Sequence, residues 1–242
     1  MPETYDYYDT ENLFSVARGY LKREGIMQTT KRALVFLGDI PLSRLLFLKK
    51  QRYFTFNNRM LPYLYARYNK AWKNERAIEI PLFKQILGDT PSELIVEVGN
   101  VLQHYYPVNH IIVDKYEQAP GVINEDILSF NPGRKFKHII SISTIEHIGV
   151  DDRPQNPQKA VVALQKLQTL LTKDGTITLS FPANYNSALM QLVKKKVKGY
   201  AFKRYNRQHN LWKQCDKADI LNFTGSPPEG IFLLQIKATD IL

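Results

Sequence analysis

The chain has 242 residues, which is long enough for one complete α/β domain with an extension. Hydrophobic residues make up 44% and charged residues 23%, a globular composition that excludes disorder throughout the chain. Its single cysteine, Cys215, excludes an internal disulfide framework or a metal site built from cysteines, and it fits a reducing, cytoplasmic setting. The net charge of +10 favours anionic partners such as nucleic acid, acidic glycans or a membrane surface.

Residues 1–90 combine mixed periodicity with many aromatic and basic residues, so we expect a helical or irregular N-terminal cap. Its first residues are acidic and polar, unlike a secretory signal. The most apolar stretch, residues 33–50, contains Asp39, Pro41 and Arg44 and is too broken for a transmembrane segment. It favours a buried amphipathic helix, with peripheral contact to a membrane as the alternative. Residues 65–87 should contain a helix that breaks near Pro81.

From Glu93 onward, strand and helix patterns alternate, and we assign residues 91–242 to one domain. Apolar and β-branched runs predict strands at residues 94–98, 110–113, 122–124, 138–143, 176–181 and 230–239. Helical spacing of apolar residues predicts a helix over about residues 157–171, closed by Gly175. Such alternation predicts a parallel sheet flanked by helices, because parallel neighbours need crossover connections.

A basic insertion near residues 186–217 interrupts this domain, and residues 187–202 are expected to be helical. Residues 184–214 hold eight Lys or Arg and no Asp or Glu. Such a run is either a solvated face or a contact with an anion. The aromatic residues within it suit sugars, anionic glycans or single-stranded nucleic acid, and packing into a core explains them equally well. They are Tyr185, Tyr200, Tyr205 and Trp212.

Polar residues follow several predicted strands at their carboxyl ends, where open α/β sheets bind ligands. Glu97 and Gly99 follow the first strand, Asp114 the second, Asp126 the third and residues 143–147 the fourth. A glycine permits close backbone approach, and a carboxylate at a strand end can accept both ribose hydroxyls. A turn glycine or a capping carboxylate would look the same in isolation. The coincidence of these positions predicts a nucleoside site.

These residues, together with "SISTIEHIG" at 141–149 and "LLTKDGTITLSFP" at 170–182, resemble the class I S-adenosylmethionine-dependent methyltransferases over residues 93 to about 185. The resemblance implies a Rossmann-like, seven-stranded, mostly parallel sheet that binds S-adenosyl-L-methionine across the tips of its first half. It also implies a set of cofactor-binding residues: Glu97, Gly99, Asp114, Lys115, Asp126, Ile127, Ser143 and Thr144.

By the same resemblance, Glu97 and Gly99 would line the methionine end, with Arg76 or Glu79 near it. Asp114 would bind the ribose, and Asp126 with Ile127 the adenine. The family's first motif has three alternating glycines, but here Val101 and Gln103 replace the last two, which narrows the room for a ligand. A second hypothesis is therefore a non-catalytic interaction protein whose cofactor pocket is filled by these side chains. A nicotinamide-dependent oxidoreductase is the third.

His147 is the best-placed general base for a hydroxyl acceptor, because histidine titrates near neutral pH. A structural role for the Glu146–His147 pair is the alternative. The acceptor would be an oxygen or nitrogen of a small-molecule or anionic glycan-like substrate, contacted by Glu146, Tyr185 and His209. Nucleic acid is less favoured, because no nucleic-acid-binding module accompanies the basic run. No spacing of His, Cys and acidic residues predicts a metal site.

Overall fold

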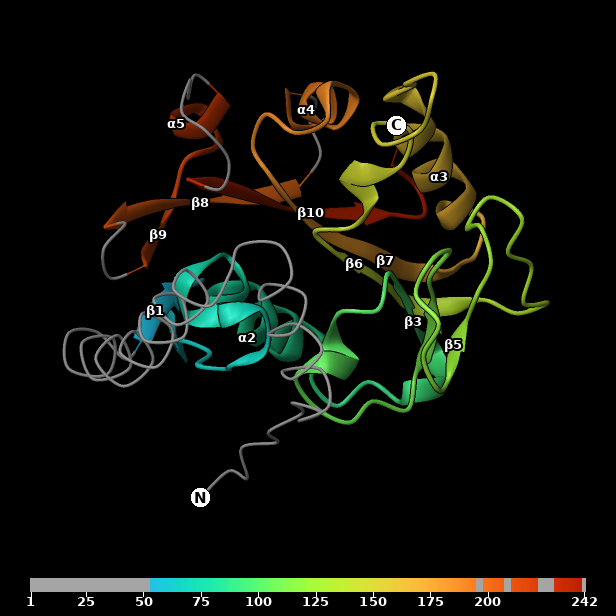
Figure 1. Cartoon of the computed structure of the whole chain (residues 1–242), viewed down its shortest axis with the longest axis horizontal. Helices are drawn as coiled ribbons and strands as arrows, with labels where there is room; N and C mark the ends of the chain where they lie inside the picture. Colours follow the sequence, from blue (N-terminus) through green and yellow to red (C-terminus); the bar gives the residue numbers. More distant parts are fainter. Residues whose placement is uncertain (1–52, 195–197, 207–209, 222–228, 241–242) are drawn as a thin grey trace, which may run out of the picture.

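The computed structural model describes residues 53–194, 198–206, 210–221 and 229–240 (Figure 1). The described residues form an eight-stranded sheet in the order β5-β4-β3-β6-β7-β10-β8-β9 and a separate hairpin of β1 and β2. Strands β5 to β7 of this order pair in parallel, and β7, β10, β8 and β9 pair antiparallel. The predicted Rossmann-like α/β fold is confirmed, with eight strands instead of seven.

The strands are β1 (Tyr53–Phe56), β2 (Arg59–Pro62), β3 (Ile95–Val98), β4 (Ile111–Val113), β5 (Val122–Ile123), β6 (Phe136–Ile142), β7 (Leu171–Pro182), β8 (Lys198–Asn206), β9 (Leu211–Cys215) and β10 (Gly230–Lys237). The α-helices are α2 (Arg76–Leu87), α3 (Gln158–Gln168), α4 (Ser187–Lys194) and α5 (Lys217–Leu221). Short 3-10 helices lie at η1 (Tyr68–Lys73), η2 (Ser92–Leu94), η3 (Leu102–His104) and η4 (Ile145–His147). None of the helices in the described ranges is long and apolar enough to cross a membrane.

The sheet separates two hydrophobic cores, because successive side chains of a strand point to opposite faces. Ile139 of β6 packs with α3 and α4 on one face, and Ile140 packs with α2 and the hairpin on the other. Figure 1 shows α3 and α4 above the sheet and α2 below it. Both isoleucines are fully buried, and burial of one such side chain contributes about 1.5–3 kcal/mol.

Helix α2 continues through Pro81, where the sequence predicts a break. A proline inside a helix removes one N–H, which leaves the carbonyl four residues earlier without its helical donor. Here that carbonyl belongs to Ala77, and it accepts a hydrogen bond of 2.8 Å from the backbone N–H of Leu64. Leu64 lies just after β2, so the residues that follow this strand supply the donor that Pro81 lacks.

The N-terminal cap and the basic insertion differ from the prediction. Residues 1–52 lie outside the described residues, but 53–62 form the β1–β2 hairpin instead of a helix or irregular chain. The expected helix over 187–202 ends at Lys194, and β8 begins at Lys198. Phe202 faces the core on the α2 side and Ala201 the opposite core, a strand alternation hidden in sequence by the surrounding lysines.

Gly175 does not close α3, which already ends at Gln168. It lies inside β7, in an irregular stretch where the register against β6 shifts between Phe136 and His138. A Cβ at Gly175 would lie 2.9 Å from the carbonyl oxygen of Phe136. Gly175 therefore permits the close approach of β6 and β7. The turn that follows α3 lies before it, between Gln168 and Leu171.

Candidate functional site

A cavity of about 280 Å³ opens at the carboxyl ends of β3, β4 and β6. Parallel strands bring these ends to one edge, since Val98 is in register with Val113 of β4 and with Ser141 of β6. Among the residues that line the cavity are eight of the twelve predicted site residues: Gly99, Asp114, Lys115, Asp126, Ile127, Ser143, Thr144 and His147. The sequence-based positions therefore converge on one site.

Gly99 forms the wall of the cavity at the tip of β3. Its φ is +88°, a left-handed conformation that side chains rarely adopt. A Cβ there would lie 2.3 Å from Oγ1 of Thr144, so the close neighbour that requires this glycine is the loop after β6. The glycine and the threonine together bring the β3 and β6 loops into direct contact.

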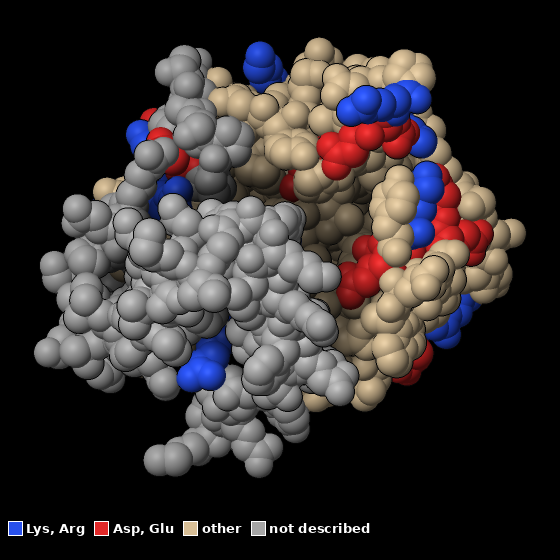
Figure 2. Space-filling view, viewed as in Figure 1, with Lys and Arg blue, Asp and Glu red and all other residues tan. Residues whose placement is uncertain are grey.

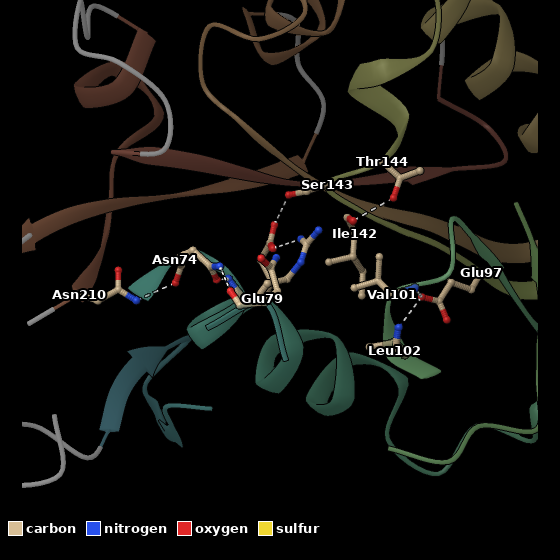
Figure 3. A network of polar contacts seen from close by, with 11 residues as sticks. Asn74, Glu79, Glu97, Val101, Leu102, Ile142, Ser143, Thr144 and Asn210 are labelled. Atoms are coloured by element: carbon tan, nitrogen blue, oxygen red, sulfur yellow. Dashed lines mark hydrogen bonds and ion pairs between the residues drawn. The ribbon is translucent and has the colours of Figure 1, made fainter. Parts of the chain in front are cut away.

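Glu97 lies beneath the loop after β3 rather than in the wall of the cavity. Its Oε1 accepts hydrogen bonds from the backbone N–H groups of Val101 (3.0 Å) and Leu102 (2.8 Å), as Figure 3 shows. Its Oε2 lies 2.7 Å from Nε2 of His110, and the glutamate is fully buried. Both carboxylate oxygens are thus engaged in holding the loop.

The residues that replace the family's glycines do not fill the cavity. Val101 and Leu102 turn inward and pack with Ile140 and the α2 side of the core. Gln103 points elsewhere, and its side-chain amide donates to the carbonyl of Pro120 at 2.9 Å. None of these three side chains lines the cavity, so the loop leaves the space next to Gly99 open.

Asp114 closes the loop after β4 and also lines the cavity. Its Oδ1 accepts the backbone N–H groups of Tyr116 and Glu117, both at 2.8 Å. Within the described ranges, its Oδ2 accepts one hydrogen bond, from the N–H of Asn100 at 3.2 Å, and keeps capacity for another donor. A ribose hydroxyl is a donor of the required kind.

Lys115 and Asp126 face each other across the cavity, with Nζ and Oδ2 3.0 Å apart. Burial acts to raise the pKa of Asp126, but the Leu128 N–H and Lys115 outweigh it and hold this pKa below its usual value. The hydrogen bond to Asp126 raises the pKa of Lys115 in turn. The neighbouring Ile127 is 5% exposed and adds an apolar wall.

Acidic side chains dominate the lining of the cavity. The described lining contains five carboxylates and two lysines. Both lysines already form ion pairs, Lys115 with Asp126 and Lys159 with Asp152. In the space-filling view, acidic atoms gather on the right-hand part of the face, around the β3–β5 edge (Figure 2). The site is therefore electrostatically suited to a cation.

Ser143 links the cavity to the buried face of α2. Its hydroxyl donates to Oε1 of Glu79 at 2.6 Å, and Oε2 of Glu79 accepts from Arg76 (Figure 3). Ser143 itself has a φ of +40°, an uncommon backbone conformation that orients its side chain. Of the two residues expected near the methionine end, Glu79 touches a residue of the cavity wall and Arg76 supports it.

Further carboxylates lie around this pair. Glu146 is 1% exposed, and its Oε2, like that of Glu75, is buried without a hydrogen-bond partner among the described residues. Burial raises the pKa of Glu146 well above its usual value, and the nearby Glu79 adds to the effect. Burial and Glu79 likewise raise the pKa of Glu75. Glu79, which lies among these carboxylates, is stabilised by its ion pair with Arg76.

His147 is oriented by two polar side chains. Its Nδ1 lies 2.7 Å from Oδ2 of Asp151 and 2.8 Å from the hydroxyl of Tyr185, which is 3.4 Å from Oδ1 of the same aspartate. When Nδ1 donates to Asp151, Nε2 carries a lone pair and can accept a proton. The three residues have the geometry of a base with an orienting carboxylate.

Sequence reasoning missed Asp151, although its spacing of four residues from His147 was visible. His209 lies outside the described residues, so its predicted contact with the acceptor has no structural counterpart here. Within the described ranges, no three His, Cys, Asp or Glu side chains are placed to hold a metal ion.

No protein-family model matches the chain, and no curated protein matches it. Solved structures that resemble it include the N-methyltransferase NodS from Bradyrhizobium japonicum WM9 with S-adenosyl-l-homocysteine, at 14% identity over 68% of this chain and 88% of that chain, TM-score 0.42. An S-adenosylmethionine-dependent methyltransferase from Clostridium acetobutylicum matches at 13% identity over 69% and 91%, TM-score 0.36. The plantazolicin methyltransferase BpumL with SAH matches at 11% over 64% and 79%, TM-score 0.37. Values this low do not establish a function.

Proposed function

We propose that this protein is an S-adenosylmethionine-dependent methyltransferase that methylates an oxygen or nitrogen of a small-molecule or glycan-like acceptor. One observation carries this function: residues from separate strand ends, predicted individually from sequence, line a single cavity. The predicted cytoplasmic setting remains part of the proposal. None of the described residues of the basic run lines the cavity, so this site lends no support to an anionic acceptor.

The side chains of the cavity fit an adenosine group. Oδ2 of Asp114 can accept a ribose hydroxyl, and Ile127 offers an apolar surface for the base. Asp126 can receive the adenine amino group if Lys115 moves aside, which costs little because exposed ion pairs are weak. Glu97 and Thr144 would act indirectly, by holding the loops on either side of Gly99.

The charge of the lining distinguishes this cofactor from a dinucleotide. S-adenosylmethionine supplies an electrophilic methyl group on a positively charged sulfonium. An acidic cavity attracts such a cation, whereas the diphosphate of a nicotinamide dinucleotide would meet repulsion from Asp114, Glu125 and Asp151. The oxidoreductase hypothesis is therefore disfavoured.

The alternative of a non-catalytic protein with a filled cofactor pocket is also disfavoured, because neither Val101 nor Gln103 lines the cavity. It required Val101 and Gln103 to occupy the space left by two missing glycines. Val101 instead packs into the core and Gln103 binds the β4–β5 connection. Since neither residue lines the cavity, no observation favours this alternative over an enzyme.

Within the proposed reaction, His147 removes the proton from a hydroxyl acceptor through Nε2. Asp151 would hold the imidazole by Nδ1, and Tyr185, whose hydroxyl lies 2.8 Å from the same nitrogen, would contact the acceptor from outside the cavity lining. A positioned general base contributes about 10²–10⁴ in rate, and alignment of the acceptor with the methyl group supplies much of the remainder. Glu146 is 1% exposed and too buried for direct contact with the acceptor.

Calorimetric titration with S-adenosylhomocysteine tests the proposed function. Wild type should bind, and Asp114→Ala should weaken binding by about tenfold, because a charge-assisted hydrogen bond is lost. Asp174→Ala, which removes a fully exposed carboxylate outside the cavity, is the matched control and should bind as wild type does. Absence of binding by wild type at millimolar ligand would refute the proposed cofactor.

A further inference from the structure

A second hollow lies at the opposite end of the sheet and shares no lining residue with the cofactor cavity. This groove has a volume of about 790 Å³, and its floor includes His138 near the start of β6 with Thr176 and Thr178 of β7. Ser143 lies five residues beyond His138, which corresponds to about 16 Å along a strand. The groove is thus a separate site, on the face covered by α2 and the hairpin.

The charge of the groove is opposite to that of the cofactor cavity. Among the described residues, three cations line it, Arg59 from β2, Lys198 from β8 and Lys237 from β10, together with one acid, Asp240. None of the three cations has an ion-pair partner in the described part of the chain. Oδ2 of Asp240 is engaged by the backbone N–H of Lys237 at 2.8 Å. A positive charge therefore remains to be neutralised.

Two polar atoms of the floor also lack partners. Thr178 is 1% exposed, yet its Oγ1 makes no hydrogen bond within the described residues, and neither does Nδ1 of His138. In register with Thr178 lie Ile140 of β6 and Gln235 of β10, and neither side chain bonds its hydroxyl. A buried hydroxyl without a partner costs free energy that a ligand oxygen would restore.

The walls of the groove are held in place before any ligand binds. The side-chain amide of Asn57, at the tip of the hairpin, donates to the hydroxyl of Tyr200 in β8 at 3.2 Å. The ring of Phe56 meets that of Tyr200 edge to face at 4.9 Å between centroids. The backbone N–H of Asn57 donates to Oε1 of Gln214 in β9 at 3.3 Å. These contacts join the hairpin to the antiparallel half of the sheet.

We propose that this groove binds an organic phosphate. Three cations without an ion-pair partner in the described part of the chain match a dianionic phosphate, and Thr178 and His138 lie at the floor with hydrogen-bonding atoms. The volume far exceeds an inorganic ion, and amide side chains of Asn57, Gln85 and Gln235 can meet hydroxyl or carbonyl groups of an attached organic part. This site does not depend on the proposed methyl transfer, because the two sites share no residue.

Calorimetry with glucose 1-phosphate, uridine monophosphate and inorganic phosphate tests the proposed site and separates sugar from nucleotide sources. At least one organic phosphate should bind more tightly than inorganic phosphate, and its binding should weaken as salt is added. Lys198→Ala should weaken binding by about tenfold and Thr178→Val by severalfold. Binding of S-adenosylhomocysteine should be the same in both variants as in wild type.

Lys213→Ala is the matched control, because Lys213 belongs to the same basic run but lies on β9 outside the groove. It should bind the organic phosphate as wild type does. Arg59→Ala serves as a second charge variant should Lys198→Ala fail to fold, as judged by circular dichroism. The inferred site is wrong if no organic phosphate binds, if the organic part adds nothing to phosphate affinity, or if Lys213→Ala weakens binding as much as Lys198→Ala.

Discussion

Two groups of carboxylates lie on either side of the tip of β6, and they differ in their hydrogen-bond donors. Asp114 and Asp126 on the cavity side are partly exposed and accept backbone N–H groups, and the pKa of Asp126 lies below its usual value. On the α2 side, Glu75 and Glu146 each have an oxygen without a hydrogen-bond partner among the described residues, and burial raises their pKa values. Hydrogen-bond donors therefore accompany the lowered pKa of Asp126, and burial accompanies the raised pKa values of Glu75 and Glu146.

This difference assigns separate roles to the two groups. The cavity side, where the pKa of Asp126 is lowered, has an acidic lining that can attract a cationic cofactor. On the α2 side, burial and Glu79 raise the pKa values of Glu75 and Glu146, and Glu79 itself bonds Ser143.

Glu97 is the buried acid with the most complete set of donors, so its loss should have the largest effect. Glu97→Ala removes the acceptor for two backbone N–H groups and for His110. We expect a loss of about 3–5 kcal/mol in the free energy of unfolding, measured by urea denaturation. Glu93→Ala, at an exposed glutamate of η2, is the control and should change little. A cost below about 1 kcal/mol for Glu97→Ala would contradict this role.

Gly99→Ala should cost about 2–4 kcal/mol in unfolding free energy and weaken binding of S-adenosylhomocysteine, because the new Cβ collides with Thr144 in addition to the strain of a left-handed backbone. Gly133→Ala provides the comparison. Gly133 also has a positive φ, of +67°, but open space surrounds its Cβ position. Equal costs for the two variants would show that contact with Thr144 is unimportant.

Glu146→Gln should flatten the dependence of stability on pH. A carboxyl whose pKa is raised in the folded state stabilises the fold at low pH, and that stabilisation disappears as the pH rises from the ordinary glutamate pKa through the raised value. Each unit of raised pKa contributes about 1.4 kcal/mol of this dependence. Urea denaturation between acidic and alkaline pH measures it. Parallel profiles for wild type and Glu146→Gln would refute protonation of Glu146.

Asp126→Asn should have the smallest effect on stability, below about 1 kcal/mol, because its partner Lys115 is 43% exposed and solvent screens the pair. The sign with pH is opposite to that of Glu146. A lowered pKa stabilises the fold above the ordinary aspartate pKa, and the effect disappears as the pH falls through the lowered value. Thermal unfolding at neutral and acidic pH checks this, and a cost that persists at acidic pH would contradict it.

The sequence predicted the edge at which the site lies, because strands that pair in parallel necessarily bring Gly99, Asp114 and Ser143 together. It could not predict the direction of Val101, since only the packed core shows that space under β6 exists for this side chain. The contact of Ser143 with Glu79 spans 64 residues, and no local pattern encodes such a pair. In β8, the surrounding lysines hide the strand pattern in the sequence, in which Ala201 and Phe202 face opposite cores.

The most direct test of the central claim is a crystal structure of the wild-type protein with S-adenosylhomocysteine. We predict density for the ligand in the cavity between Gly99 and Ile127, with a ribose hydroxyl within hydrogen-bonding distance of Asp114 and the sulfur near Ser143. Ligand bound at another site, or a cavity that stays empty at saturating ligand, would contradict the account.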